Sequence, residues 1–270
     1  MSELTQRIIT SLIAAPVFLY LTWLGGWPFL IAVVVISGVI QLEVINMLEK
    51  QELVVQRVPA LLMGVPVVLM PVYPQAWAAL LMVISMLVVM ATFNPKRKDC
   101  ADLTPAFFAG LFTPALLSGL VMLRNIGDDS TGFALTVSLL LMVWANDVFA
   151  FAGGSTTGRR PLAPSISPSK TVEGFLWGFV GCFAALWLSY YLLPPFEPHL
   201  LTGMVFAVLV GLAGPAGDLA ESRLKRTSGI KHSSSVMPGH GGLYDRFDAL
   251  LMAAPVAAVY FQVVFFFGWY

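Results

Sequence analysis

Long apolar segments, each ending at a charge or at a Gly/Pro cluster, dominate the pattern of hydrophobic and polar positions along the chain. Six long stretches contain no Asp, Glu, Lys or Arg: 8–42, 58–95, 103–123, 174–196, 198–217 and 249–270. A membrane-spanning helix needs about 20 predominantly apolar residues, so several of these stretches could cross a bilayer. Dividing them at charges and Gly/Pro clusters predicts nine helices, near 8–25, 28–48, 58–73, 76–93, 103–123, 132–152, 174–193, 200–217 and 247–268. The predicted fold class is therefore an all-α, polytopic integral membrane protein.

The composition agrees with this pattern. Apolar residues make up 58% of the chain and charged residues only 11%, whereas soluble domains carry roughly 25% charged residues. This excludes a soluble enzyme, a DNA-binding domain and a disordered tail. Fifteen basic and fifteen acidic residues give no formal net charge, so no attraction to nucleic acid is implied.

The basic residues indicate an orientation. With nine spans, all fifteen Lys and Arg residues except Arg124 fall on one side. Cytoplasmic loops carry the positive excess, so the N-terminus is predicted to be cytoplasmic. Two loops on that side, 153–173 and 218–246, are dense in Gly, Pro, Ser and charge. Long loops of this kind tend to carry function.

One candidate cluster follows the eighth predicted helix. If that helix continues beyond residue 217, one face carries Asp218, Glu221, Ser222 and Lys225, at spacings of i, i+3, i+4 and i+7. Acidic residues near membrane depth are candidates for function by default. The alternative is a solvated helix end with a Glu221–Lys225 pair.

A second cluster leads into the last predicted helix. Glycines on both sides of His240 allow close approach of backbone to a ligand, and the following helix N-terminus could bind an anion. Asp245 and Asp248, at i and i+3, could hold a divalent ion over that anion. The alternative is an acidic first turn that complements the helix dipole.

A third cluster lies around the sixth and seventh predicted helices. Asp147 is followed by a loop with three basic groups and many hydroxyls, which enters a helix near Glu173. Such a loop could hold a polyphosphate, or it could simply be a positive cytoplasmic loop. Farther upstream, Glu43 is either a buried polar partner or the point where the second helix leaves the membrane.

The ordered motifs of residues 144–248 resemble the signature of the phosphatidate cytidylyltransferase (CDP-diacylglycerol synthase) family. The resemblance is carried by three runs: Asp147 through Ser167-Pro-x-Lys170-Thr171-x-Glu173-Gly, Gly217-Asp218-x-x-Glu221-Ser222-x-x-Lys225-Arg226-x4-Lys231, and Pro238-Gly-His240-Gly-Gly-x-x-Asp245-Arg246-x-Asp248. It implies the condensation of CTP with phosphatidic acid to CDP-diacylglycerol and pyrophosphate. It also implies a multi-pass enzyme of the cell inner membrane, surrounded by membrane lipids and assembled as a homodimer.

The resemblance also implies roles for individual residues. Mg²⁺ is the expected cofactor, with K⁺ as a second candidate cation. The residues expected in catalysis are Lys170, Asp218, Lys225, His240 and Asp245. The residues expected to bind the metal are Asp218, Asp245, Glu221 and Asp248. The residues expected to bind substrate are Ser167, Thr171, Glu173, Ser222, Arg226 and Arg246. Asp147 matches a family acid without an assigned role.

One position departs from the family pattern. His232 follows Lys231 where the family has Asp, which removes a carboxylate. A non-catalytic or altered-specificity paralogue therefore stays an alternative, as does a membrane transporter, which would also contain intramembrane acids. On the enzyme interpretation, residues 1–95 are accessory, serving anchoring or dimerisation, and residues 96–270 form the catalytic region.

Overall fold

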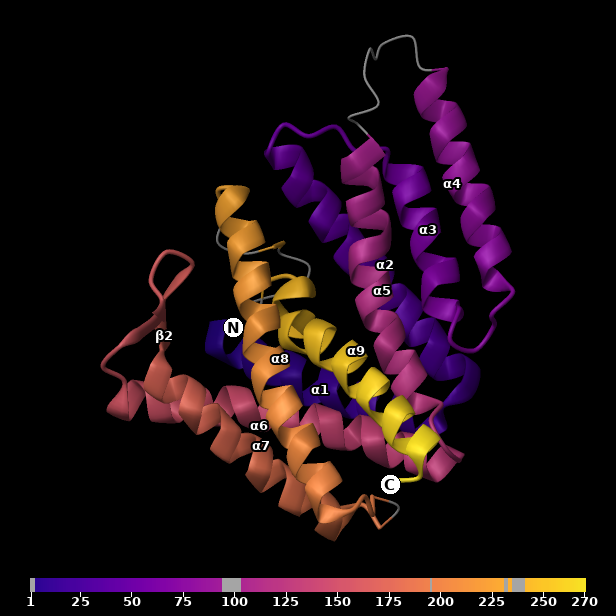
Figure 1. The fold of residues 1–270 in the computed structure, drawn as a ribbon. Helices are drawn as coiled ribbons and strands as arrows, with labels where there is room; N and C mark the ends of the chain where they lie inside the picture. The colour runs from indigo at the N-terminus through magenta and orange to yellow at the C-terminus, as the bar shows by residue number, and fades with distance from the viewer. Residues whose placement is uncertain (1–2, 94–102, 195, 231–232, 235–240) are drawn as a thin grey trace. The chain divides into compact units, whose positions relative to one another are not determined.

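The computed structural model describes residues 3–93, 103–194, 196–230, 233–234 and 241–270 (Figure 1). Within this part, the chain forms nine α-helices and one two-stranded hairpin. In order, the elements are α1 (Glu3–Leu24), α2 (Gly26–Lys50), α3 (Arg57–Leu69), α4 (Ala76–Thr92), α5 (Leu103–Arg124), α6 (Asp129–Thr157), β1 (Pro161–Ala163), β2 (Ser167–Thr171), α7 (Val172–Leu192), α8 (Leu200–Thr227) and α9 (Tyr244–Phe267).

The predicted all-α membrane fold is confirmed. A helix lies at each of the nine predicted places, and six helices (α2 and α5 to α9) are long and apolar enough to cross a membrane. The side chains of α1 are described from Leu12 onward, and the apolar segment Leu12–Leu24 is shorter than a full span. Helices α3 and α4 are also shorter than a full span. The protein is a multi-pass membrane protein, whereas the nine-crossing topology and the cytoplasmic N-terminus stay predictions.

The chain divides into two compact units that each contain sequence-distant segments. Unit 1 comprises Met1–Val121 and Leu224–Arg246, and unit 2 comprises Met122–Arg223 and Phe247–Tyr270. The prediction that residues 1–95 are accessory and 96–270 catalytic is not tested by this division.

In unit 1, helix α2 packs against α3, and α3 packs against α4. The buried Gln41 side chain on α2 donates from Nε2 to the carbonyl oxygen of Ala60, at 2.9 Å. A Cβ atom on Gly64 of α3 would overlap the Gln41 side chain, so the glycine allows this close packing.

In unit 2, α6 and α7 run antiparallel, side by side, with the β1–β2 hairpin at one end (Figure 1). Small residues bring the two helices together: a Cβ on Gly174 would lie 2.8 Å from the carbonyl oxygen of Ala150, and a Cβ on Gly178 would lie 2.7 Å from Asn146 Nδ2. The single basic residue on the predicted external side, Arg124, is buried and forms an ion pair with Asp129 at 2.8 Å. Its charge is thereby compensated locally.

Both predicted functional loops contain more regular structure than expected. Residues 153–157 continue α6, because Gly153 and Gly154 pack against Trp177 and Gly174 of α7 instead of breaking the helix. Residues 161–171 form the antiparallel hairpin, with Pro161 paired to Thr171 and Ala163 to Ser167. Residues 218–227 continue α8, which is the condition under which Asp218, Glu221, Ser222 and Lys225 share one helix face. Helix α9 begins three residues earlier than predicted, at Tyr244.

Candidate active site

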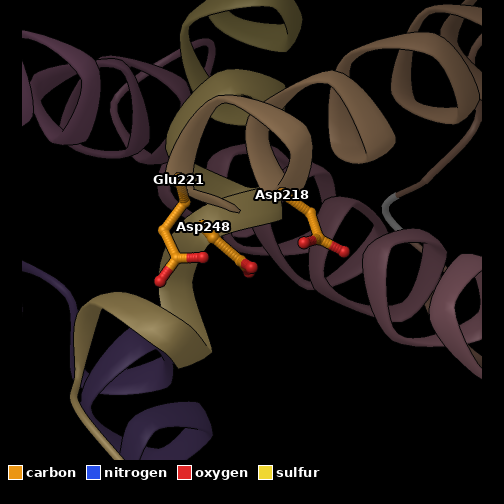
Figure 2. A group of neighbouring side chains, drawn as sticks. All are labelled: Asp218, Glu221 and Asp248. Atoms are coloured by element: carbon orange, nitrogen blue, oxygen red, sulfur yellow. The ribbon is translucent and has the colours of Figure 1, made fainter. Parts of the chain in front are cut away.

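Three carboxylates from α8 and α9 converge in unit 2. Asp218 and Glu221 lie one turn apart on α8, and Asp248 lies in the second turn of α9 (Figure 2). One oxygen of each carboxylate lies within 4.8 Å of the others, and Glu221 is fully buried. Figure 2 shows the three side chains directed to the same side of the two helices. We call Asp218, Glu221 and Asp248 the carboxylate trio.

A close backbone contact brings the trio together. A Cβ atom on Gly217 would overlap the backbone carbonyl oxygen of Asp248, so only glycine lets α8 approach α9 this closely. One turn earlier, Gly214 faces Ala249 with room for a methyl group, at 3.8 Å. The two helices therefore approach each other more closely beside Asp218 and Asp248 than one turn earlier.

The trio has the chemistry of a divalent-cation site. Hard oxygen ligands from carboxylates are those that Mg²⁺ prefers, usually together with substrate phosphates. Like charges in a buried site repel one another unless a cation or a proton compensates them. Lys170 forms an ion pair with Asp218 and supplies one positive charge to the three acids. The residues present therefore fit a bound Mg²⁺.

The hairpin that carries Lys170 is anchored at its base. Thr171 caps α7, because its Oγ1 accepts a hydrogen bond from the Gly174 backbone N–H at 3.1 Å. The Glu173 carboxylate accepts hydrogen bonds from the backbone N–H groups of Arg159, at 2.9 Å, and Arg160, at 3.2 Å. These contacts fix the course of the chain into and out of the hairpin, and with it the place of Lys170.

A cavity of about 400 Å³ in unit 2 is lined by both residues of the Lys170–Asp218 ion pair. Its walls come from α6, the hairpin, α7 and α8. The polar lining residues are Asn146, Asp147, Ser155, Ser169, Lys170, Thr171 and Asp218, and the apolar ones include Phe151, Leu162, Phe175 and Pro215. A cavity with an ammonium group, hydroxyls and aromatic rings can accept a ligand that combines phosphates with a planar ring.

Sequence reasoning did not single out three of these polar lining residues. Asn146 is buried and donates from Nδ2 to the Cys182 sulfur, at 3.4 Å. Its place beside Asp147 in an apolar run was a usable signal. Ser169 stands within the Ser167–Glu173 motif, whereas Ser155 becomes a candidate only because α6 continues past Gly154.

A second polar cluster lies in unit 1. Lys225 Nζ lies 2.6 Å from Asp245 Oδ1, and only 14% of the lysine side chain and 7% of the aspartate side chain are exposed. Asp245 Oδ2 also accepts from the Ser233 backbone N–H (3.1 Å), the Ser233 hydroxyl (3.2 Å) and the Gly242 backbone N–H (3.0 Å). Asp245 is thus surrounded by protein donors and is not a member of the carboxylate trio. Lys225 pairs with Asp245.

Of the two interpretations of Glu43, a buried polar partner or the point where the second helix leaves the membrane, the structure supports the first. Its carboxylate accepts from the backbone N–H groups of Leu243 (2.9 Å) and Tyr244 (2.7 Å). It also accepts from the hydroxyls of Ser233 (3.0 Å) and Ser234 (2.5 Å). The N–H groups at the start of α9, which the sequence suggested as an anion site, therefore donate to the protein's own carboxylates.

The remaining predicted site residues lie at separate positions. Asp147 lines the cavity, and Ser222 donates a long hydrogen bond of 3.4 Å to Asp218 Oδ1. Ser167 lies half-buried on β2, while Arg226 and Arg246 are exposed on α8 and α9. His240 and His232 lie outside the described residues. The roles of all these residues in binding or catalysis stay predictions.

Comparison with known proteins identifies relatives along nearly the whole chain. A protein named phosphatidate cytidylyltransferase from Synechocystis sp. (strain ATCC 27184 / PCC 6803 / Kazusa) is 30% identical over 292 aligned positions, which cover 96% of each chain. One of the same name from Bacillus subtilis (strain 168) is 29% identical, covering 98% of this chain and all of its own length. One from Aquifex aeolicus (strain VF5) is 45% identical over 148 positions, about half of each chain.

These relatives share their name, and two of them align from end to end with this chain. The family model described as "Cytidylyltransferase family" matches residues 5–264, which include every residue of the trio, the hairpin and the Glu43 cluster. This chain belongs to the cytidylyltransferase family.

Proposed function

We propose that this protein transfers the cytidylyl group of CTP to phosphatidic acid, giving CDP-diacylglycerol and pyrophosphate for phospholipid synthesis. The observation that carries the proposal is the position of Asp218. It belongs to the carboxylate trio, pairs with Lys170 and lines the 400 Å³ cavity. A cation site and an ammonium group therefore adjoin a space for a phosphate-bearing ligand. The reaction itself is inferred from the relatives, which are named phosphatidate cytidylyltransferase.

The position of the trio along its helices favours an enzyme over a transporter. Asp218 and Glu221 lie in the last ten residues of α8, and Asp248 is the fifth residue of α9. The basic residues Lys225 and Arg226 follow directly, which is typical of a cytoplasmic boundary. Transporter sites lie near the bilayer midplane. At the cytoplasmic boundary, a nucleotide can arrive from water and a lipid phosphate from the membrane.

The reaction needs positioning and charge neutralisation more than a protein nucleophile. A phosphate oxygen of phosphatidic acid, already anionic at neutral pH, attacks the α-phosphorus of CTP. The bond from that phosphorus to the bridging oxygen breaks, and pyrophosphate leaves with the electron pair. Three phosphate-bearing groups must approach or separate, so most of the catalytic effect is electrostatic and geometric.

Lys170 has the chemistry to neutralise phosphate charge at the cavity wall, where it lies beside Asp218. Thr171 and Glu173 act by holding the hairpin and the start of α7 in place. Ser167, Ser222, Arg226 and Arg246 are proposed to contact substrate phosphates. Lys225 and Asp245 are proposed to act as a pair, in which Asp245 orients the lysine ammonium group. His240 is proposed to act in catalysis on the strength of the resemblance.

We propose Mg²⁺ as the cofactor, held by Asp218, Glu221 and Asp248. When bound, it would neutralise phosphate charge during the transfer. Asp245 stays a proposed Mg²⁺ ligand, but it is a weaker candidate than the three residues of the trio, because its oxygens already accept from Lys225, Ser233 and Gly242. K⁺ is proposed as a second cation only from the resemblance.

The proposed location is the cell inner membrane, since the relatives in Synechocystis and Bacillus are bacterial and this chain spans a membrane. A homodimer is also proposed from the resemblance. Mass determination of the detergent-solubilised protein tests the dimer: a monomer mass at micromolar concentration contradicts it.

A label-transfer assay tests the reaction. Purified protein in detergent is mixed with CTP labelled in the cytosine ring, phosphatidic acid and Mg²⁺, and label that enters the lipid phase is followed. Asp218→Asn should abolish the transfer, whereas Glu52→Gln, which alters an exposed acid after α2, should transfer at the parental rate. A folded parent that gives no labelled lipid between pH 6 and 9, with and without K⁺, contradicts the proposal. It would favour a non-catalytic or altered-specificity paralogue, and transfer of label to other lipid phosphates would indicate altered specificity.

A further inference from the structure

Glu43 lies on α2, about 190 to 200 residues before its hydrogen-bond partners in the chain. We propose that Glu43 is a positioning residue for cytidylyl transfer: it holds Ser233 and the start of α9 in the arrangement that keeps Asp245 paired with Lys225. The inference rests on the proposed role of Lys225 and Asp245 in the reaction. It assigns a function to a residue outside the three motifs that carry the family resemblance.

The first support is the number of donors that the Glu43 carboxylate accepts. Two hydroxyls and two backbone N–H groups lie within 3.0 Å of its oxygens, and only 2% of the residue is exposed. The single proton of the Ser233 hydroxyl is shared between Glu43 Oε2 and Asp245 Oδ2, and together with the other three donors it comes close to the acceptor capacity of a carboxylate. A buried carboxylate in an apolar helix is costly unless it is hydrogen-bonded, and these donors supply the hydrogen bonds that Glu43 needs.

The second support is the place at which Glu43 binds. Leu243 directly precedes α9 and Tyr244 is its first residue, and the first N–H groups of a helix have no partner within the helix. A negative charge there is stabilised by the helix dipole. Glu43 therefore acts as a cap supplied by a distant helix. Because it also binds Ser233 and Ser234, it joins these two residues to the start of α9.

The third support is the connection from Glu43 to Asp245. The Ser233 hydroxyl lies 3.0 Å from Glu43 Oε2 and 3.2 Å from Asp245 Oδ2, while the Ser233 backbone N–H donates to Asp245 Oδ2. The other Asp245 oxygen, Oδ1, accepts from Lys225 at 2.6 Å. A displaced Glu43 would therefore shift Ser233, and with it the carboxylate that orients Lys225.

The packing around Gly242 supports the same arrangement. A Cβ atom there would overlap the Ser233 hydroxyl and lie 2.7–2.8 Å from both Glu43 oxygens. Glycine at this position is thus required by the Glu43 contacts themselves. The requirement links the glycine-rich run of the sequence to a residue on α2.

Glu43→Gln tests the proposal, because an amide keeps the size but turns one acceptor into a donor that faces N–H and O–H groups. We expect kcat for label transfer to fall by roughly 30-fold or more, with KM for CTP changed less than about threefold. Ser233→Ala is the milder variant, which leaves three of the four donors, and should lower kcat by about five- to tenfold. The matched control is Glu49→Gln, on the same helix, whose carboxylate pairs with Arg57 at the surface. It should stay within about twofold of the parent.

A double mutant separates positioning from general stabilisation. If Glu43 acts through the Asp245–Lys225 pair, adding Glu43→Gln to Lys225→Met should cost much less activity than adding it to the parent. Equal fold-losses in the two backgrounds would overturn the proposal. If Glu43→Gln does not fold, Ser233→Ala decides: kcat within twofold of the parent would overturn the proposal as well. A parent that transfers no label, or a Lys225→Met variant with full activity, contradicts the underlying function or the role of the pair instead, and the inference falls with it.

Discussion

Gly217 on α8 has no room for a side chain, because a Cβ atom there would overlap the backbone carbonyl oxygen of Asp248 on α9. The contact sets the separation of the two helices next to the carboxylates of Asp218 and Asp248. The carboxylate trio therefore depends on a glycine that itself carries no chemistry.

Gly217→Ala is expected to push α8 and α9 apart. Overpacking of this kind typically costs about 1–3 kcal/mol, and displacement of the reacting groups by about 1 Å can cost 100-fold in rate. We expect label transfer to fall about 10- to 100-fold and the Mg²⁺ concentration for half-maximal activity to rise. Gly214→Ala, one turn earlier, is the matched control, since its Cβ would make an ordinary contact of 3.8 Å with Ala249. Equal activity of the two variants would show that the close approach is irrelevant.

Removal of the Lys170 charge tests the ion pair with Asp218. Lys170→Met should lower kcat for transfer by about 100-fold or more, because a charge placed for the transition state is lost. Lys50→Met removes an exposed lysine at the end of α2 and should leave the rate unchanged. Lys170→Arg should recover part of the activity. An arginine variant as inactive as the methionine variant would indicate that shape, and not charge, is required.

Gly242→Ala tests the packing around Glu43 independently of any charge change. The new methyl group must displace the Ser233 hydroxyl or the Glu43 carboxylate, so activity should fall several-fold although no charge is removed. Gly38→Ala on α2 is the control, because a Cβ there meets no atom within 4 Å and alanine favours a helix. Parental activity of Gly242→Ala would mean that Ser233 can move without consequence.

Asp128 outside the membrane gives a pH-dependent contribution to stability. It caps α6, and hydrogen bonds from Thr131 and Ser130 lower its pKa from 3.8 to about 2. The unfolded chain therefore takes up a proton first as the pH falls, so the stabilisation is complete above about pH 4 and is lost towards pH 2. The unfolding temperature of the parent should exceed that of Asp128→Ala by a constant amount at pH 5–7, and the difference should shrink below pH 4.

Asp128→Asn is the control for this measurement. Asparagine is also a good N-cap but does not titrate, so its advantage over Asp128→Ala should not change with pH. A parent whose advantage stayed constant down to pH 2 would contradict the lowered pKa.

The class of fold could be predicted from the sequence, because in a membrane every helix must present apolar side chains to lipid and satisfy its own backbone groups. Apolar stretches alone therefore located nine helices. The ends of α4 and α5 were predicted to within one residue, whereas the end of α6 was not. Gly153 and Gly154 suggested a loop, yet they continue α6, since contacts with Trp177 and Gly174 on α7 outweigh the weak helix propensity of glycine.

The sequence by itself also determined the grouping of Asp218 with Glu221 and Ser222, since helical spacing fixes which residues share a face. The family resemblance put Asp248 and Asp245 together with this group, and only the tertiary structure separated the two: Asp248 lies beside Asp218 and Glu221, whereas Asp245, three residues earlier on α9, accepts from Lys225, Ser233 and Gly242. The tertiary structure alone decided that Glu43 caps α9. The physical reason is the same in both cases: spacing along the chain governs contacts within one helix, whereas contacts between helices depend on packing, which is set here by glycines such as Gly217 and Gly242.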